Sequence, residues 1–463
     1  MKICLIDPPG VTKGLNVGLG YIASSLINQN HQVKVIDLND NTKDFRNRLD
    51  SIKSYDLIGI SIKSSVARSA REISDILGRK DLICGGVHIA VDGYNFLNDN
   101  PNFSIGVIGE GEETLIKIAN VMENGLALRD IKGIVYRDGG EIITNPESGS
   151  IADLDSLPYP SYEFFDSFNG TIAEYPLVTS RGCPYSCVYC CVRLISGKKW
   201  RFRTPESVIR ELEFAKSKYK SMRFEISDDN FTQNIDRVKE ICKLLLKHEI
   251  GMSWSCPNGI RAKGLDEESV ALMKESGCDS VSIGIESLDE AVFDNIKKGE
   301  KVDDIRQAIS ILHSHKIKVS GFFIVGLPGD NLQKIKSSVE LSKKLPLEGA
   351  IWNLFVPYPG TRAWSWVNSE AKIIRGWEEG FHFGGKLSSV FETDGFSEKE
   401  RIRAFELANI KCRAYLAFFD KNKSLLANAF HILRLIFKYD PQNIFPHIFY
   451  GLRQYRGRFS GDG

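Results

Sequence analysis

Three cysteines lie close together near the middle of the chain. Within residues 181–191, RGCPYSCVYCC, Cys183, Cys187 and Cys190 have the spacing C-x3-C-x2-C. Three thiolates at this density can bind three irons of a 4Fe-4S cluster and leave the fourth iron without a protein ligand. An open iron can bind a substrate or a cofactor, as the open position of a catalytic zinc does. The spacing therefore predicts a reactive metal centre.

Two other uses of these cysteines fit the sequence less well. A structural zinc ordinarily has four ligands, often from two C-x2-C pairs, and no second pair lies nearby. A disulfide framework is not expected in a chain of this size and type. We interpret Cys191 as a bystander beside Cys190. Six scattered cysteines are interpreted as small buried hydrophobic residues: Cys4, Cys84, Cys242, Cys256, Cys278 and Cys412.

The bulk composition is typical of a globular protein with two or three domains. The chain has 463 residues, 42% of them hydrophobic and 26% charged. The formal net charge of +1 creates no global field for nucleic acid, so no such partner is expected. No signal peptide is expected, and no apolar run reaches the ~20 residues of a membrane span. Four clustered cysteines out of ten favour a reducing cytoplasm.

Strands and helices are expected to alternate over residues 1–140. This alternation predicts an α/β fold, a doubly wound, Rossmann-like parallel sheet with helices on both faces. Ligands of such sheets bind at the carboxyl ends of the strands. The expected strands cover residues 2–7, 32–37, 57–61, 81–86 and 103–108, and the expected helices begin near residues 18, 67 and 109.

Residues 141–170 are expected to link this domain to a second one. A hairpin is predicted over residues 133–146, where Asp138-Gly139-Gly140 supplies the turn. The prolines of residues 154–160 should keep the following stretch extended.

Residues 171–365 repeat a strand–loop–helix pattern six times, which predicts a partial (β/α)6 TIM-like barrel. Active sites of such barrels lie at the carboxyl ends of the strands, and the cysteine segment directly follows the first strand. The expected strands cover residues 175–180, 222–227, 252–256, 280–286, 318–325 and 350–356. The expected helices cover residues 205–217, 234–248, 266–275, 289–296, 302–315 and 331–344.

Several motifs together resemble one enzyme family. The cysteine motif, with an aromatic residue before its last cysteine, resembles the signature of the radical S-adenosylmethionine (SAM) superfamily. Later segments, GIES, GLPG and PGT, are similar to motifs of its cobalamin-linked branch. In the first domain, PPG, GLGYIA, GGVH and GEGEET resemble the cobalamin-binding-like domain fused to many radical SAM enzymes. The nearest resemblance is to class B radical SAM methyltransferases and to the anaerobic Mg-protoporphyrin ester cyclase.

The resemblance implies a reaction. The cluster would bind SAM and cleave it reductively to a 5′-deoxyadenosyl radical, which abstracts hydrogen from carbon. With cobalamin present, the implied reaction is C-methylation of an unactivated carbon. Two alternatives stay open: a radical SAM cyclase or oxidoreductase without methyl transfer, and a non-catalytic iron–sulfur binding or sensing module. The implied partners are a small-molecule or lipid-like substrate and a one-electron donor such as a flavodoxin or ferredoxin.

The resemblance also implies where SAM binds. The SAM-binding residues implied are Tyr189, Glu225, Asp228, Asp229, Ser255, Arg261, Gly284, Glu286, Gly326, Leu327 and Pro328. Some of these residues have an alternative to SAM binding. Glu286 could be an ordinary carboxylate at a strand end, and residues 326–329 could form only a turn. Asp228 and Asp229 could cap the next helix.

Cobalamin would lie at the strand ends of the first domain. The D-x-H-x-x-G segment that supplies an axial histidine in other cobalamin proteins is absent, so a bound cobalamin would be base-off without a protein histidine on cobalt. His31 is interpreted as a turn residue, whereas His88 could line a ligand or be structural. A pocket without cobalamin is the alternative. The implied cobalamin-binding residues are Pro9, Gly10, Gly18, Ser61, Ser64, Gly85, Gly86, His88, Gly109, Glu110, Gly111 and Glu112.

Residues 366–463 are expected to form a helical C-terminal region, with an amphipathic helix over residues 397–419. Residues 425–439 and 444–455 mix apolar, aromatic and basic side chains. From residue 411 onward the chain has nine Lys and Arg against three Asp and Glu, a net charge of +6. Apolar and aromatic residues alternate with these charges. This pattern predicts either a helical cap on the open side of the barrel or contact with a membrane surface or a lipid-like substrate, which would make the protein peripheral to the membrane.

Overall fold

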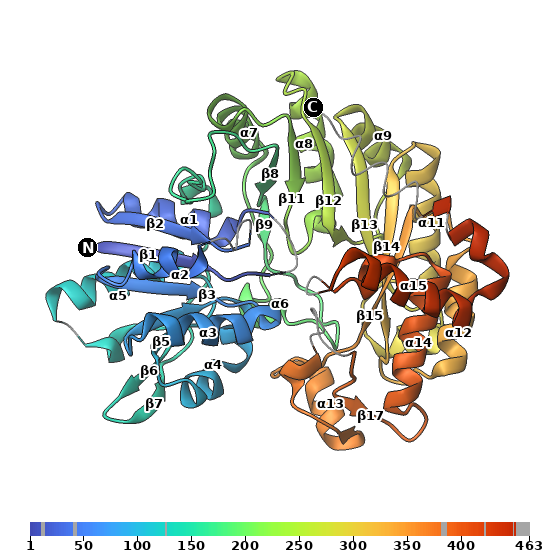
Figure 1. The fold of residues 1–463 in the computed structure, drawn as a ribbon. Coiled ribbons are helices and arrows are strands. Elements are labelled where there is room, and N and C mark those ends of the chain that lie inside the picture. The colour runs from blue at the N-terminus through green and yellow to red at the C-terminus, as the bar shows by residue number, and fades with distance from the viewer. Residues whose placement is uncertain are drawn as a thin grey trace.

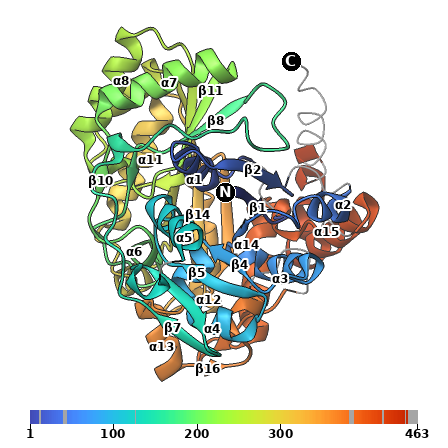
Figure 2. The same cartoon turned by 90° about the vertical axis from the view of Figure 1, so that its left-hand side faces the viewer.

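The computed structural model describes residues 1–10, 14–39, 44–125, 127–380, 387–420, 423–447 and 449–450. Two α/β units follow one another along the chain, and a helical C-terminal region packs beside the second (Figure 1). The predicted fold class is confirmed. Figure 2 looks onto the N-terminal unit, with the second unit behind it.

The N-terminal unit is a seven-stranded sheet in the order β2-β1-β3-β4-β5-β6-β7. Strands β1 to β5 are parallel, and five of the six residues of β1 are buried, as expected for a strand covered on both faces. The strands are β1 (Lys2–Asp7), β2 (Gln32–Asp37), β3 (Leu57–Ser61), β4 (Leu82–Gly85), β5 (Phe103–Val107), β6 (Ile134–Asp138) and β7 (Glu141–Thr144). The helices are α1 (Val17–Ile27), α2 (Phe45–Asp50), α3 (Ala67–Leu77), α4 (Val87–Asp99) and α5 (Glu112–Asn124).

The predicted hairpin forms and belongs to the first sheet. Strand β6 pairs antiparallel with β5, and β7 pairs antiparallel with β6. The sheet therefore extends to Thr144, beyond residue 140 where the linker was expected to begin. The domain bounds themselves stay predictions.

The second unit is a six-stranded parallel sheet in the order β15-β14-β13-β12-β11-β8, with helices on its outer face. Its strands are β8 (Glu174–Leu177), β11 (Arg223–Ile226), β12 (Ser253–Ile260), β13 (Cys278–Glu286), β14 (Lys318–Val325) and β15 (Gly349–Leu354). Its helices are α7 (Pro205–Tyr219), α8 (Ile235–Lys247), α9 (Glu267–Glu275), α10 (Glu290–Asn295), α11 (Val302–Ser314) and α12 (Leu332–Ser342).

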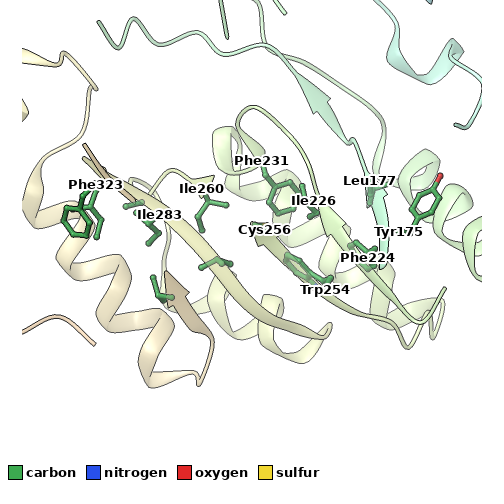
Figure 3. Close-up of a cluster of buried hydrophobic side chains, with 14 of the residues drawn as sticks. Tyr175, Leu177, Phe224, Ile226, Phe231, Trp254, Cys256, Ile260, Ile283 and Phe323 are labelled. Carbon is green, nitrogen blue, oxygen red and sulfur yellow. The ribbon is translucent and has the colours of Figure 1, made fainter. Parts of the chain in front are cut away.

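Alternate side chains of these strands form the core beneath the outer helices. Phe224 and Trp254 stack with ring centroids 5.9 Å apart, and both are buried. Cys256 and Ile283 continue the same buried layer (Figure 3). The intervening residues, such as Glu225, lie on the opposite face of the sheet because successive side chains of a strand alternate.

The C-terminal region covers one edge of this sheet. It contains α13 (Arg362–Glu370), α14 (Glu398–Lys411) and α15 (Leu425–Tyr439). The Asn409 amide of α14 accepts a hydrogen bond from the Trp352 N–H and donates one to the Trp352 C=O, which satisfies backbone groups at the free edge of β15. The predicted helix over 397–419 ends earlier, because Arg413 takes a left-handed conformation with φ of 58°. No described helix is long and apolar enough to cross a membrane.

Candidate functional site

The cysteine loop leaves the barrel between two short antiparallel strands. Strand β9 (Ser180–Arg181) and strand β10 (Arg201–Phe202) pair with each other and close the loop at its base. The loop contains helix α6 (Val192–Ile195) and lies between the two sheets (Figure 1). The carboxyl end of β8 therefore presents the cysteines toward the N-terminal unit.

Two aspartates that follow β11 hold the start of this loop. Asp228 is buried, and its Oδ1 accepts a hydrogen bond from the Thr179 N–H at 2.6 Å. Its Oδ2 accepts from the hydroxyls of Thr179 and Ser180 at 2.6 and 2.7 Å. Asp229 accepts from the Gly182 N–H at 2.8 Å. Both carboxylate oxygens of Asp228 are engaged inside the protein, and its contact with SAM stays a prediction.

The three cysteines of the motif are half-buried. The Asn230 amide lies 3.7 Å from the Cys183 Sγ, and the Cys190 N–H donates to the Cys187 C=O at 3.2 Å. No three described His, Cys, Asp or Glu side chains are close enough to hold one metal ion. Cysteines of a 4Fe-4S cluster bind different irons, so they stand further apart than the ligands of one ion.

Glu286 lies beside the cysteine loop in a strained conformation. It is buried at the end of β13 with φ of 62°, which is unusual for a residue other than glycine. Its Oε1 accepts a hydrogen bond from the Tyr189 hydroxyl at 2.9 Å and lies 3.4 Å from the Lys298 Nζ. The Lys298 Nζ also donates to the Gly284 C=O. The structure thus brings Tyr189, Gly284 and Glu286 together, as expected for one binding site.

We expect Glu286→Gln to weaken SAM binding roughly 10–100-fold without removing iron, because a charge-assisted hydrogen bond contributes about 1.5–3 kcal/mol. SAM affinity and iron content per chain are the measurements. The matched control is Glu290→Gln, an exposed carboxylate four residues later. Equal SAM affinity of the two variants would contradict a role of Glu286 in binding.

The next strands contribute further expected residues. The Arg261 guanidinium lies 3.4 Å from the centre of the Tyr185 ring and donates to the Lys298 C=O at 2.9 Å. Glu225 of β11 pairs in register with Ser255 of β12, so both side chains lie on the same face. Burial and the nearby Glu174 raise the pKa of Glu225.

The turn after β14 is held from two sides. The Gly326 N–H donates to the Asp330 carboxylate at 2.9 Å, and the Gly326 C=O accepts from the buried Arg401 of α14 at 3.1 Å. Gly326 has φ of 100°, and a Cβ there would overlap the Arg401 guanidinium. Leu327 is buried beneath the turn, and Pro328 follows it. The turn is therefore fixed by a helix that lies outside the barrel repeat.

Gly326→Ala is expected to lower the free energy of unfolding by roughly 1–3 kcal/mol, because a left-handed residue other than glycine is strained and Arg401 must move. Chemical denaturation followed by tryptophan fluorescence measures the change. Gly349→Ala is the control, since the nearest atom to its Cβ would be the Ser320 Oγ at 3.8 Å. Unchanged stability of Gly326→Ala relative to this control would contradict the argument.

Two arginines join the base of the cysteine loop to the N-terminal unit. The Arg201 guanidinium binds both carboxylate oxygens of Glu110, at 2.8 and 3.0 Å. Arg181 binds Glu112 at 2.6 Å and Glu110 at 3.3 Å. All four side chains are at most 13% exposed. We call these four residues the Arg–Glu clamp.

The electrostatics of the clamp favour ionised carboxylates. Burial alone would raise the pKa of Glu110, but hydrogen bonds from Arg201 and the charge of Arg181 outweigh burial and hold it below the usual range. A lowered folded-state pKa gives stability that is present above the unfolded-state pKa and lost as the pH falls through the folded-state value. The clamp should therefore weaken only in acid. Both glutamates were predicted to bind cobalamin, whereas neither arginine was predicted to have a role, although Arg181 lies only two residues before Cys183.

The strand ends of the N-terminal unit carry a second polar cluster. The Asp7 carboxylate accepts hydrogen bonds from the amides of Asn16 and Asn39 at 2.8 and 2.6 Å. Asn16 also donates to the Ser61 hydroxyl at 3.2 Å, and Asn39 accepts from the Gly10 N–H. Of the expected cobalamin residues, this cluster gathers Ser61, Gly10 and its neighbour Pro9.

The glycines expected around cobalamin fall into two groups. Gly85 and Gly109 stand at the ends of β4 and β5, and a Cβ on Gly109 would meet only Ile195 of the cysteine loop and Ser148, at 3.7 and 3.9 Å. Gly86 begins α4 with φ of 101°. Gly18 and Gly111 instead lie at the starts of α1 and α5, and a Cβ on Gly111 would clash with Ile22 of α1 at 2.9 Å.

His88 is enclosed by protein groups. Its ring is fully buried at the start of α4, where Nε2 lies 3.0 Å from Glu378 and Nδ1 lies 3.3 Å from the Ser64 hydroxyl. The ring also stacks on Trp377 with centroids 5.2 Å apart. Trp377 and Glu378 of the C-terminal region cover the ring, which fits the structural alternative, and contact of His88 with cobalamin stays a prediction. Ser64 is buried with it.

Comparison with known proteins identifies the class. The model of the radical SAM superfamily matches residues 177–342, and the model of the B12 binding domain matches residues 11–119. An uncharacterized methyltransferase of Pyrococcus horikoshii is 28% identical over 448 residues, covering 93% of this chain and 95% of the relative. The anaerobic magnesium-protoporphyrin IX monomethyl ester cyclase of Rubrivivax gelatinosus is 24% identical, covering 60% of this chain and 51% of the relative.

A solved structure has the same fold. The radical S-adenosylmethionine methyltransferase TsrM of Kitasatospora setae, with cobalamin and a [4Fe-4S] cluster bound, matches with a TM-score of 0.72 and 15% identity, covering 89% of each chain. Fold, motif and matches together define a radical SAM enzyme whose barrel follows a B12-binding domain. The chain thus contains a region that matches the radical SAM superfamily, preceded by a region that matches the B12 binding domain. The resemblance stated from the sequence is confirmed.

Proposed function

We propose that this chain is a cobalamin-dependent radical SAM methyltransferase that methylates an unactivated carbon of a small molecule. The observation that carries the proposal is the Arg–Glu clamp. It joins the base of the cysteine loop to the loop after β5, where ligands of a doubly wound sheet bind. Two cofactors at these two loops would face one another. The P. horikoshii relative is named an uncharacterized methyltransferase, and the match covers nearly its whole length. It therefore supports the same reaction class.

Each cofactor has residues that fit it. Cys183, Cys187 and Cys190 would hold the 4Fe-4S cluster, and three thiolates leave one iron free for SAM. Tyr189, Glu286 and the turn at Gly326 would hold SAM beside that iron. Cobalamin would lie at the carboxyl ends of the strands of the N-terminal unit, where Gly85 and Gly109 have no side chain of their own. When bound, the cluster supplies one-electron reduction of SAM and cobalamin supplies methyl transfer.

We further propose that cobalamin binds base-off, without a histidine on cobalt. The described N-terminal unit has two histidines. His31 lies at the amino end of β2, on the side of the sheet away from the ligand-binding edge, and 3.4 Å from the Met1 amine. His88 is occupied by Glu378 and Ser64. The one-electron donor for the cluster would be a protein such as a flavodoxin or ferredoxin.

The cobalt content of the anaerobically purified protein, reconstituted with hydroxocobalamin, tests this proposal. We expect cobalt to be retained through gel filtration, and an absorption spectrum of base-off cobalamin. A protein that loads iron and cleaves SAM but retains no cobalt would favour the cyclase or oxidoreductase alternative, for which the R. gelatinosus relative is the precedent. A protein that loads iron and never cleaves SAM would favour the iron–sulfur binding module.

A further inference from the structure

Helix α15 carries a row of large apolar side chains on its outer face. Leu426, Phe430, Leu433 and Phe437 follow one another at steps of four, three and four residues, so they share one face of the helix. Leu426, Phe430 and Phe437 are 83%, 73% and 60% exposed. Single exposed apolar residues are ordinary, but a continuous row of this kind marks an interaction site.

The opposite face of α15 is already packed. Leu435 and Ile436 are buried against Ile410 of α14. The Asn428 side chain, also buried, donates to the backbone carbonyl of Asp420 at 2.9 Å and fixes the start of the helix. The helix is therefore seated on the protein, and its apolar row points outward because the other face is occupied.

The segment after α15 carries two more exposed aromatic side chains. Phe445 and Phe449 are 75% and 70% exposed and lie four residues apart. His447, between them, is buried, with its Nε2 2.8 Å from Asp440 and its Nδ1 hydrogen-bonded to the Tyr415 hydroxyl. The buried His447 keeps the two phenylalanines outward. We define the apolar patch as Leu426, Phe430, Leu433, Phe437, Phe445 and Phe449.

Positive charge accompanies the apolar patch. Residues 411–463 hold nine Lys and Arg against three Asp and Glu, a net charge of +6, whereas the whole chain has +1. Arg434 is exposed next to the row and has no ion-pair partner among the residues described. An apolar helical face flanked by basic residues is the arrangement that lies in the headgroup region of an anionic bilayer.

We propose that the apolar patch docks the protein on the surface of an anionic membrane, with α15 lying in the plane of the interface. A second copy of the chain fits this face less well, because a symmetric contact would oppose two segments of charge +6. The chain's own residues 451–463 are also a less suitable occupant of the apolar patch. They carry three arginines and one aspartate, and their net positive charge would lie against a segment that is already basic. The proposal is independent of methyl transfer.

Co-sedimentation of the full chain with vesicles tests the proposal. We expect binding to phosphatidylcholine vesicles that contain phosphatidylglycerol, and much weaker binding to pure phosphatidylcholine. The triple variant Leu426→Gln, Phe430→Gln and Phe437→Gln should bind at least about tenfold more weakly, because each side chain loses its insertion. Arg434→Gln should bind about fivefold more weakly, and only to the anionic vesicles.

The matched control is Met222→Gln with Leu246→Gln, two exposed apolar residues on the barrel. It should bind like the unaltered chain. Two outcomes overturn the proposal. In the first, the chain does not bind vesicles but forms concentration-dependent dimers, and the triple variant does not form them. In the second, vesicle binding appears only after residues 451–463 have been removed. The first makes the patch a dimer interface, and the second makes it the seat of the chain's own terminus. SAM cleavage in solution is measured separately and does not enter this comparison.

Discussion

Replacing Cys183 with alanine is expected to abolish the iron–sulfur centre and all cleavage of SAM. Two cysteines of the motif would remain, and a cluster that normally has three thiolate ligands is not retained with two. Because the cluster is the group proposed to reduce SAM, 5′-deoxyadenosine formation should fall by at least about 1,000-fold, to background. The measurements are iron and sulfide per chain and 5′-deoxyadenosine by mass spectrometry.

Cys191 provides the control within the same loop. It is half-buried like the others and directly follows Cys190. Cys191→Ala should keep its iron and its activity. Loss of iron in Cys191→Ala together with retention in Cys183→Ala would show that the wrong three cysteines have been assigned. Loss in both variants would indicate a site with four thiolate ligands and no open iron.

Glu110→Gln is expected to destabilise the protein strongly. Arg201, 3% exposed, would lose the charge of its bidentate partner, and breaking a buried ion pair from one side costs about 3–5 kcal/mol. Hydrogen bonds from Arg201 to the backbone carbonyls of Ile151 and Ser196 remain, so we expect about 3 kcal/mol, and a Tm lower by roughly 5–10 °C. Chelator-dependent loss of iron should also be faster, because the base of the cysteine loop is less firmly held.

The control for this variant is Glu113→Gln, one residue after Glu112. Glu113 is 64% exposed and contacts only Lys117 at 3.4 Å, so its loss should cost less than about 0.5 kcal/mol. The double variant Glu110→Met with Arg201→Met should be less destabilised than the sum of the two single variants, because no unpaired charge is left buried. Equal Tm values for Glu110→Gln and Glu113→Gln would contradict the clamp.

Much of the fold could be predicted because its strands are apolar runs separated by short loops. Strand β1 is buried on both faces, and the buried residues of β14 alternate with partly exposed ones. The bounds of both strands were predicted to the residue. Helix α4 was missed. It has Gly93 in its interior and a non-helical Asp92, so its local propensity is low, and packing against β5 and β6 stabilises it instead.

The residues of the candidate site could be predicted only where they belong to a recognisable sequence motif. Asp228 and Asp229 are adjacent in the sequence, and only the geometry of the chain after β11 decides that the first is enclosed by Thr179 and Ser180. The pairing of His88 with Glu378 joins residues 290 positions apart, which no local pattern contains. The C-terminal helix α14 is held at the edge of β15 by the contact between Asn409 and Trp352. These residues are also far apart in the sequence, so no local pattern predicts the contact.

We propose that one chain couples a SAM-cleaving cluster to cobalamin-dependent methyl transfer. The most direct measurement is the product ratio of the anaerobic protein, loaded with iron, sulfide and hydroxocobalamin and supplied with SAM and a one-electron reductant. We predict 5′-deoxyadenosine together with S-adenosylhomocysteine, the latter in proportion to the bound cobalamin. 5′-Deoxyadenosine without S-adenosylhomocysteine in the cobalamin-loaded protein would contradict methyl transfer.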